Sequence, residues 1–365
     1  MSKNLFVYGA GAIGRGFLPW IFPPDQFDYT FIETNPILRR RLQRRRVFST
    51  FKTTARGYEQ RKVPIKRCLA LGEEAALLPT AEVIVTAVGP RNVVSLGGRL
   101  RGVSAPILCF ENDATLPPII ASLSGQEKVF FAIPDVITSN TASPAILRRD
   151  SLALVTEAGV CYIDEGAKMV GGDCRYVSKP ELAKQWLAKL YLHNTPHCIA
   201  AYLGARLGVK YLHQAMSDSR VRQIVEGAMA EVTLMLVKTN GLRLSFAKHY
   251  AEKEIKRFAN RRLFDPIERV AREPLRKLAP GERLVGAAQR CLGAGVRPIN
   301  LTLGIMAAFF YRHPKDADQN LPYLLRALSP ADFLSLVIQL RPDEALHQFV
   351  LNHWAEHRES LDLIK

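Results

Sequence analysis

A glycine-rich segment near the start of the chain most constrains what this sequence can fold into. The apolar run Leu5–Tyr8 is typical of a short buried strand, and it leads into G-A-G-A-I-G-R-G, with glycines at positions 9, 11, 14 and 16. Glycines at this spacing allow a tight turn, close approach of the backbone to a pyrophosphate, and packing of the next helix on the strand. The pyrophosphate would bind at the helix N-terminus, where backbone N–H groups are free. The segment therefore predicts a dinucleotide-binding βαβ unit.

An acidic residue follows this loop at the sequence spacing expected for a residue that binds the cofactor ribose. A second apolar run, Tyr29–Ile32, ends in Glu33, close to the ~20-residue offset at which a carboxylate binds the adenosine 2'-hydroxyl. A carboxylate repels a 2'-phosphate, so NAD is favoured over NADP. From the loop itself, the residues expected to contact the cofactor are Gly9, Gly11, Ala12, Ile13 and Gly14. Pro19 and the Pro-Pro pair soon after it require the first helix to be short or kinked.

Further apolar runs follow the rhythm of a Rossmann-type α/β domain. Val83–Val88, Pro106–Phe110 and Val129–Ile133 each predict a buried strand. The first of these ends in T-A-V-G-P, and loops at the carboxyl ends of strands line the ligand crevice of such sheets. Ala87, Val88 and Gly89 are therefore added to the predicted cofactor site.

From about Pro180 to the end, the pattern is helical, without low-complexity linkers or internal repeats. We therefore expect an α/β Rossmann-type domain over residues 1–178, followed by an all-α domain over residues 179–365. A chain of 365 residues is long enough to give each domain its own core.

Composition narrows the function classes. The six cysteines are scattered without paired metal-ligand spacing, so we expect reduced thiols, a cytoplasmic protein and no metal site. No apolar run reaches the ~18 residues that span a bilayer, and the N-terminus shows no signal peptide. His353 and His357 fall in a charged segment that we interpret as a solvated helix face.

A formal net charge of +16 raises the question of an anionic partner. The basic residues are spread along the chain without aromatic interleaving, which argues against nucleic-acid binding. The densest cluster is R-R-R-L-Q-R-R-R, residues 39–46. We interpret it first as a solvated helix face and second as a patch that favours phosphorylated substrates; a clamp for a 2'-phosphate is a third alternative.

The second informative segment is K-L-Y-L-H-N-T-P-H, which places Lys189, Asn194 and His197 within nine residues. Because Thr195 precedes a proline, we expect one helix to end near Leu192 and another to start at Pro196. The positive end of the second helix would then help to keep a nearby lysine and histidine neutral, as proton transfer requires. A helix corner with Thr195 as N-cap and an ordinary surface lysine explains the same spacing.

The K-x4-N-x2-H arrangement resembles the active-site signature of the polyol-specific long-chain dehydrogenases and reductases. The flanking L-H-N-T-P-H-C-I-A-A-Y-L-G is similar to the mannitol-1-phosphate 5-dehydrogenase branch of that family. The T-A-V-G-P loop, the pair Glu111-Asn112 and the basic stretch 257–278 also resemble this branch. The resemblance covers residues 3–16, 81–112 and 189–312, and is weakest over 17–80 and 113–188.

The resemblance implies a metal-independent, NAD-dependent reaction on a sugar or sugar phosphate, with mannitol 1-phosphate and fructose 6-phosphate as the expected pair. Lys189 would be the general acid/base, Asn112 and Asn194 would stabilise the alkoxide-like oxygen, and His197 would orient the substrate. Arg269 and Lys277 would bind substrate, whereas Arg272 and Arg276 would be structural. A monomer or dimer is expected, with neither nucleic acid nor membrane as partner.

One segment departs from the family. Its usual aspartate–arginine pair near the substrate is replaced by Ile137 and Thr138, with Asp135 two residues early. The substrate is therefore open between a sugar phosphate, an unphosphorylated polyol and a sugar acid. A cofactor-binding protein that has lost catalysis is a further alternative.

Overall fold

The computed structural model describes residues 2–314 and 316–364, and the chain divides into two compact units, Met1–Trp186 and Leu187–Lys365. We call them the N-terminal unit and the helical unit. Along the chain, the boundary between the two units falls within helix α6 (Lys179–Ala188), a few residues after the boundary expected at residue 178.

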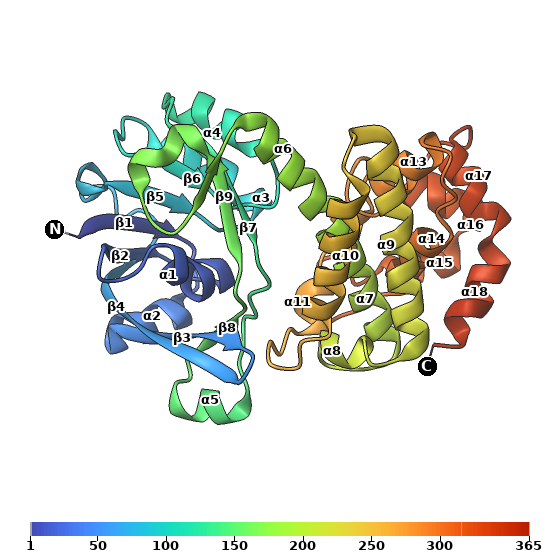
Figure 1. The fold of residues 1–365 in the computed structure, drawn as a ribbon, viewed down its shortest axis with the longest axis horizontal. Coiled ribbons are helices and arrows are strands. Elements are labelled where there is room, and N and C mark those ends of the chain that lie inside the picture. The colour runs from blue at the N-terminus through green and yellow to red at the C-terminus, as the bar shows by residue number, and fades with distance from the viewer. Residues whose placement is uncertain (1, 315, 365) are drawn as a thin grey trace. The chain divides into compact units, whose positions relative to one another are not determined.

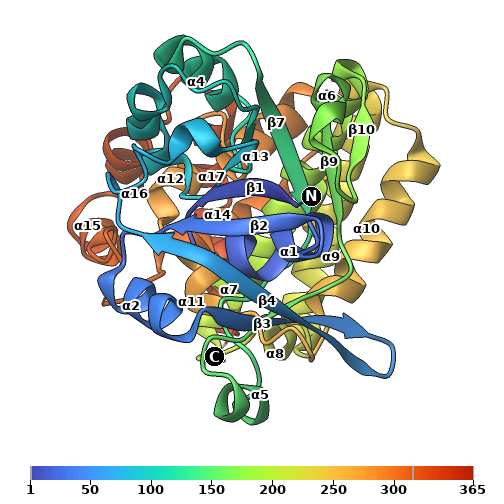
Figure 2. The same ribbon diagram turned by 90° about the vertical axis from the view of Figure 1, so that its left-hand side faces the viewer.

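The N-terminal unit contains a ten-stranded sheet in the order β10-β9-β7-β6-β5-β1-β2-β4-β3-β8. Its central strands β2, β1, β5, β6 and β7 run parallel to one another, as expected for a Rossmann-type domain, whereas β9 pairs antiparallel with β7. Figure 2 shows β1, β2 and β4 side by side. The strands are β1 (Lys3–Tyr8), β2 (Phe27–Ile32), β3 (Val47–Thr54), β4 (Gly57–Leu69), β5 (Val83–Thr86), β6 (Ile107–Cys109), β7 (Val129–Asp135), β8 (Leu154–Thr156), β9 (Val160–Asp164) and β10 (Arg175–Val177).

The sheet has an apolar core on each face. Successive side chains of β1 point to opposite faces, so Leu5 and Val7 enter one core while Phe6 and Tyr8 enter the other. This explains why the strand is an unbroken apolar run. The chain leaves β1 toward β2 on one side and returns to β5 on the other, so the loops after β1 and β5 meet at a topological switch point.

The short helices of this unit connect the strands. The first begins as a π-helix, Ala12–Phe17, and continues as α1 (Leu18–Ile21), which confirms the short, irregular helix predicted from Pro19. The others are α2 (Pro36–Arg45), α3 (Pro90–Val93), α4 (Leu116–Ser124) and α5 (Pro144–Arg149), with 3-10 segments at Leu78–Thr80, Val94–Leu100 and Glu165–Val170.

The hairpin of β3 and β4 was not foreseen from the sequence. These strands pair antiparallel from Val47 opposite Pro64 to Thr54 opposite Gly57, and β8 joins the outer edge. Arg45 of the preceding helix forms an ion pair of 2.8 Å with Asp150, and Asp150 also accepts from the Ser49 N–H. Part of the basic run therefore holds this edge together, and Arg41 also donates to Ser151. Arg40, Arg44 and Arg46 are exposed, whereas Leu42 is buried in the core.

The helical unit is built around α7 (Thr195–Arg206), whose residues from Thr195 to Gly204 are all buried. Helix α7 packs against the long helix α9 (Ser219–Asn240) and against α14 (Ile299–Phe309), and α10 (Leu244–Phe258) lies beside α9 (Figure 1). None of the helices in the described residues is long and apolar enough to cross a membrane. The remaining helices are α8 (Leu212–Ala215), α11 (Ile267–Ala271), α12 (Pro274–Leu278), α13 (Val285–Gly293), α15 (Leu321–Ala327), α16 (Pro330–Asp332), α17 (Ala345–Asn352) and α18 (Trp354–Asp362), with a π segment at Phe333–Val337.

The predicted helix break before Pro196 is wrong. Helix α6 runs into a π-helix, Lys189–Asn194, and then into α7 without interruption, and Thr195 has helical backbone angles. Thr195 is therefore not an N-cap: its hydroxyl donates to the carbonyls of Leu190 and Arg283, at 3.2 and 2.6 Å. The wide π turn and this hydroxyl accommodate a proline that lacks an N–H. No helix N-terminus is available here to act on Lys189 or His197.

The cysteines lie where core thiols are expected, whereas the expectation of a solvated His357 is wrong. All six cysteines are free thiols, and all but Cys174 are buried. His357 is buried rather than solvated, with its Nε2 2.7 Å from the Thr302 hydroxyl.

Candidate active site

The glycine loop after β1 is shaped by contacts that leave no room for side chains at two of its positions. Gly9 has φ of +97°, and a Cβ there would lie 2.6 Å from the Ala87 carbonyl oxygen. A Cβ at Gly14 would lie 2.1 Å from the Gly9 carbonyl oxygen. Gly11 differs: a Cβ there would meet no described atom within 4 Å. The loop is therefore packed on the protein side and open at Gly11, as backbone approach to a pyrophosphate requires.

Two buried carboxylates hold the loops at the switch point. Glu33 accepts from the Ala10 N–H at 2.9 Å and from the Asn35 N–H at 2.7 Å, so it braces the glycine loop from the end of β2. Glu111 accepts from the Thr86 hydroxyl at 2.7 Å and the Val88 N–H at 3.1 Å, which fixes the loop of Ala87, Val88 and Gly89. Burial raises the pKa of the Glu111 carboxyl, and the hydrogen bonds from Thr86 and Val88 oppose this rise.

Asn112 follows Glu111 at the carboxyl end of β6 and is exposed. It lies in the same unit as the glycine loop. Ile137 and Thr138, which the sequence analysis aligned with the expected aspartate–arginine pair, are both buried and serve packing. The Ile137 N–H donates to Glu157 at 2.6 Å, and the Thr138 hydroxyl bonds to that of Thr156 at 2.8 Å.

In the helical unit, the π segment places Lys189 and Asn194 at its two ends. The side chain of Lys189 is buried, with a residue exposure of 3%. Asn194 is also buried, and its Nδ2 has no hydrogen-bond partner among the described residues. An unpaired buried amide costs about 1–3 kcal/mol, and such groups are rare in folded proteins. π-helical turns often occur at functional sites, so this segment is the first candidate for one.

His197 lies early in α7 and is fixed by two neighbours, Asp265 and Phe258. Its Nε2 is 2.9 Å from Oδ2 of Asp265, and its ring stacks on Phe258 at 5.0 Å between centroids and an interplanar angle of 6°. Burial lowers the pKa of His197 to about 4, against the opposing effect of Asp265. The histidine is therefore neutral at neutral pH as the sequence predicts, although burial is the cause and a helix N-terminus is not.

Asp265 joins two of the predicted residues. Its other oxygen, Oδ1, accepts from Nε of Arg269 at 2.8 Å and lies 2.6 Å from Nη2. Burial raises the pKa of the Asp265 carboxyl, but Arg269 and the hydrogen bond from His197 outweigh it, so the net pKa lies below its ordinary range. Asp265 is thus an ionised carboxylate between His197 and Arg269.

Lys277 takes no part in the hydrogen bonds that join His197, Asp265 and Arg269. Its Nζ donates to the backbone carbonyl of Val270 at 2.5 Å and to that of Arg272, and it lies 5.5 Å from the centre of the Tyr202 ring. Burial lowers its pKa well below the ordinary lysine value. In this arrangement Lys277 supports the turn that follows Arg269. Arg276 pairs locally with Glu273 at 3.2 Å.

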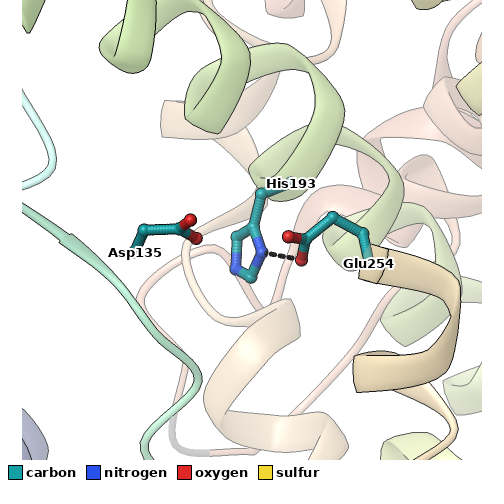
Figure 3. A group of neighbouring side chains, drawn as sticks. All are labelled: Asp135, His193 and Glu254. Atoms are coloured by element: carbon teal, nitrogen blue, oxygen red, sulfur yellow. Dashed lines mark hydrogen bonds and ion pairs between the residues drawn. The ribbon is translucent and has the colours of Figure 1, made fainter. Parts of the chain in front are cut away.

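Three site residues escaped the sequence analysis: His193, Glu254 and Asp265. Nδ1 of His193 lies 2.5 Å from Oε2 of Glu254, as Figure 3 shows. The other oxygen of Glu254 is paired with Arg257 at 2.5 Å and with Lys253 at 3.3 Å. A sequence signal existed: each carboxylate stands three or four residues before its arginine, a spacing that pairs side chains on a helix.

Comparison with known proteins gives a consistent result for both units. Residues 3–107 match the family model described as the mannitol dehydrogenase Rossmann domain, and residues 182–325 match the mannitol dehydrogenase C-terminal domain. A mannitol-1-phosphate 5-dehydrogenase from Brevibacillus brevis is 28% identical over 85% of this chain and 86% of its own length. One from an Exiguobacterium species is 29% identical over 96% of this chain and 97% of its own length.

Solved structures agree in fold. Mannitol 2-dehydrogenase from Pseudomonas fluorescens, in a ternary complex with NAD and D-mannitol, superposes with a TM-score of 0.73 at 15% identity, covering 100% of this chain and 91% of that chain. A D-sorbitol dehydrogenase in substrate-free form gives 0.65 at 13% identity, covering 100% and 93%.

Proposed function

Because this chain belongs to the mannitol dehydrogenase family, we propose that it is an NAD-dependent oxidoreductase of sugar alcohol phosphates. The proposed pair is mannitol 1-phosphate, the substrate named in the relatives that match most of its length, and its keto counterpart fructose 6-phosphate. The observation that carries the proposal is the π segment, which buries a lysine and an unpaired asparagine amide five residues apart in the family's signature.

The N-terminal unit fits a dinucleotide. Gly11 leaves the backbone open, and Glu33 stands at the end of β2, where a carboxylate receives the adenosine 2'-hydroxyl. Both Glu33 oxygens already bind backbone N–H groups, and each carboxylate oxygen has a further lone pair to offer. Bound NAD supplies the hydride acceptor.

The helical unit supplies the proton chemistry. Lys189 takes the proton from the substrate hydroxyl in the oxidative direction and returns it in reduction. A buried amine suits this role because burial disfavours the ammonium form. Asn194, whose amide Nδ2 has no hydrogen-bond partner in the part of the chain that the structure describes, and Asn112 donate to the alkoxide-like oxygen. His197 hydrogen-bonds a neighbouring hydroxyl and orients the substrate.

The basic stretch of the helical unit, residues 257–278, would bind the phosphate group of the substrate. Arg269 has a planar guanidinium with donors beyond the two that meet Asp265, and such forks suit phosphate oxygens. Lys277 contributes by holding the turn and by its charge when protonated. Six reduced thiols are consistent with a cytoplasmic enzyme.

A second candidate substrate class rests on residues 137 and 138. Both side chains are buried in packing and offer no charge to a substrate. A family member with this difference is also expected to accept an unphosphorylated polyol or a sugar acid, because the usual polar contact is missing.

The test is NADH oxidation with fructose 6-phosphate, run beside fructose and a keto sugar acid. Turnover of the phosphate alone, with mannitol 1-phosphate as product, supports the proposal. Turnover of fructose or the acid alone would move the assignment to the second class. NADH binding without turnover of any of the three would reject both.

A further inference from the structure

Two neighbouring histidines in the helical unit hydrogen-bond through opposite ring nitrogens. His193 meets Glu254 through Nδ1, whereas His197 meets Asp265 through Nε2. An ionised carboxylate only accepts hydrogen bonds, so the nitrogen that faces it must carry the proton. His193 therefore carries a proton on Nδ1, whereas neutral His197 carries its proton on Nε2 and leaves Nδ1 as an acceptor.

Any rotation of the Asp265 side chain would break its hydrogen bond with His197 or with Arg269. Its side chain is 3% exposed, and one oxygen serves His197 while the other serves Arg269. A buried carboxylate needs such partners, and removing one of them leaves an uncompensated charge. The ring of His197 has little freedom either, because it stacks in parallel on Phe258.

We propose that Asp265 is a positioning residue that orders His197 and Arg269 as one unit, fixing the Nε2–H tautomer of the histidine and the rotation of the guanidinium. The proposal rests on the proposed function. It states that His197 accepts a hydrogen bond from a substrate hydroxyl through Nδ1, while Arg269 binds the substrate's anionic group. One carboxylate thus sets the two contacts together.

The test begins with the wild-type protein. Two-bond ¹H–¹⁵N NMR spectra, with His197 assigned by its loss in His197→Gln, should show the Nε2–H form for His197 and the Nδ1–H form for His193. A His197 that carries its proton on Nδ1 would overturn the proposal whether or not any variant folds. Glu254→Gln should change the His193 signals and leave the His197 tautomer as it is.

Kinetics give the second arm. Asp265→Asn keeps the size of the side chain but removes its charge. The new NH₂ group would then face a hydrogen-bond donor, either Nε2–H of His197 or the Arg269 guanidinium. We expect kcat/KM for fructose 6-phosphate to fall about 10- to 100-fold, with kcat lowered and KM raised, the scale seen when a residue that orients another side chain is replaced. The His197 tautomer should become mixed.

The matched control is Asp218→Asn, at the N-cap of α9, where asparagine is an equally good cap. It should keep both kinetic constants within about twofold of wild type. Asp265→Asn with kcat/KM within that same range would overturn the proposal.

If Asp265→Asn does not fold, Arg269→Gln replaces it: a raised KM with an unchanged His197 tautomer supports the proposal, and an unchanged KM overturns it. An inactive wild-type enzyme with the expected tautomer would reject the proposed substrate and still support positioning by Asp265.

Discussion

The rings of His193 and His197 lie 5.1 Å apart, and each is held by its own buried carboxylate. His193 is held by Glu254 and His197 by Asp265, and both rings also contact Phe258. The π segment that contains His193 also carries Lys189 and Asn194 at its two ends. In the candidate site, contacts within the protein therefore orient both imidazole rings.

Replacing Lys189 with alanine should lower turnover of fructose 6-phosphate by about 10²- to 10⁴-fold, the range for loss of a general acid/base. NADH affinity, measured by fluorescence titration, should change little, because the cofactor loops lie in the other unit. Lys184→Ala, on a partly exposed ion pair with Glu181, is the control and should be active. Near-normal turnover in the Lys189 variant would reject its role.

Glu254 should matter more for stability than any exposed carboxylate. It is fully buried and pairs with His193, Arg257 and Lys253, so Glu254→Gln leaves buried positive charge uncompensated. We expect the free energy of unfolding in urea to fall by about 3–5 kcal/mol. Glu226→Gln, in the exposed pair with Arg222, should cost less than about 0.5 kcal/mol. Equal losses in the two variants would contradict the importance of burial here.

His197 should make the protein less stable as the pH falls. Its pKa is about 4 in the folded protein against an ordinary 6.5, so between these values the unfolded chain binds a proton that the folded chain does not. Stability from this residue is fully present above pH 6.5 and is lost on acidification, by up to about 1.4 kcal/mol per pH unit.

The comparison of wild type with His197→Asn isolates this effect, because asparagine does not titrate. Urea unfolding from pH 7 to pH 5 should give a shallower pH dependence for the variant. Parallel curves for the two proteins would show that His197 titrates near its ordinary value.

The glycine loop offers a separation of cofactor binding from folding. A Cβ at Gly11 meets no described atom, so Gly11→Ala should keep its melting temperature and lose NADH affinity at least tenfold, since the methyl group occupies the path of the pyrophosphate. Gly14→Ala should instead lower the melting temperature, because its Cβ clashes with the Gly9 carbonyl.

Gly98→Ala is the control, as it also meets no described atom and lies away from the loop. It should change neither property. If Gly11→Ala binds NADH as well as Gly98→Ala does, the pyrophosphate does not pass this glycine.

Much of the fold was predictable because its signals are local. Each of these signals predicts a Rossmann-type element from a few consecutive residues: the glycine spacing, the strand that leads to Glu33, and the buried runs at β5 and β6. The β3–β4 hairpin was not predictable in this way. Its outer strand is held by Asp150 and by β8, which come about a hundred residues later in the chain.

The path of the chain through Thr195 and Pro196 was predicted wrongly for a similar reason. Locally, a residue before proline avoids helical angles. In the folded protein, the Thr195 hydroxyl bonds to the Arg283 carbonyl, and the π turn absorbs the missing N–H. Tertiary contacts thus override the local preference.

By itself, the sequence determined the chemical groups of the site: the glycine loop, Glu33, Lys189, Asn194 and His197, all of which stand in short motifs. Only the tertiary structure decided their states. The carboxylates that orient His193 and His197 lie 61 and 68 residues away in the chain, and no spacing rule reaches that far. Burial, which makes His197 neutral and encloses Lys189, is likewise a property of the packed helices, because desolvation depends on everything that surrounds a group.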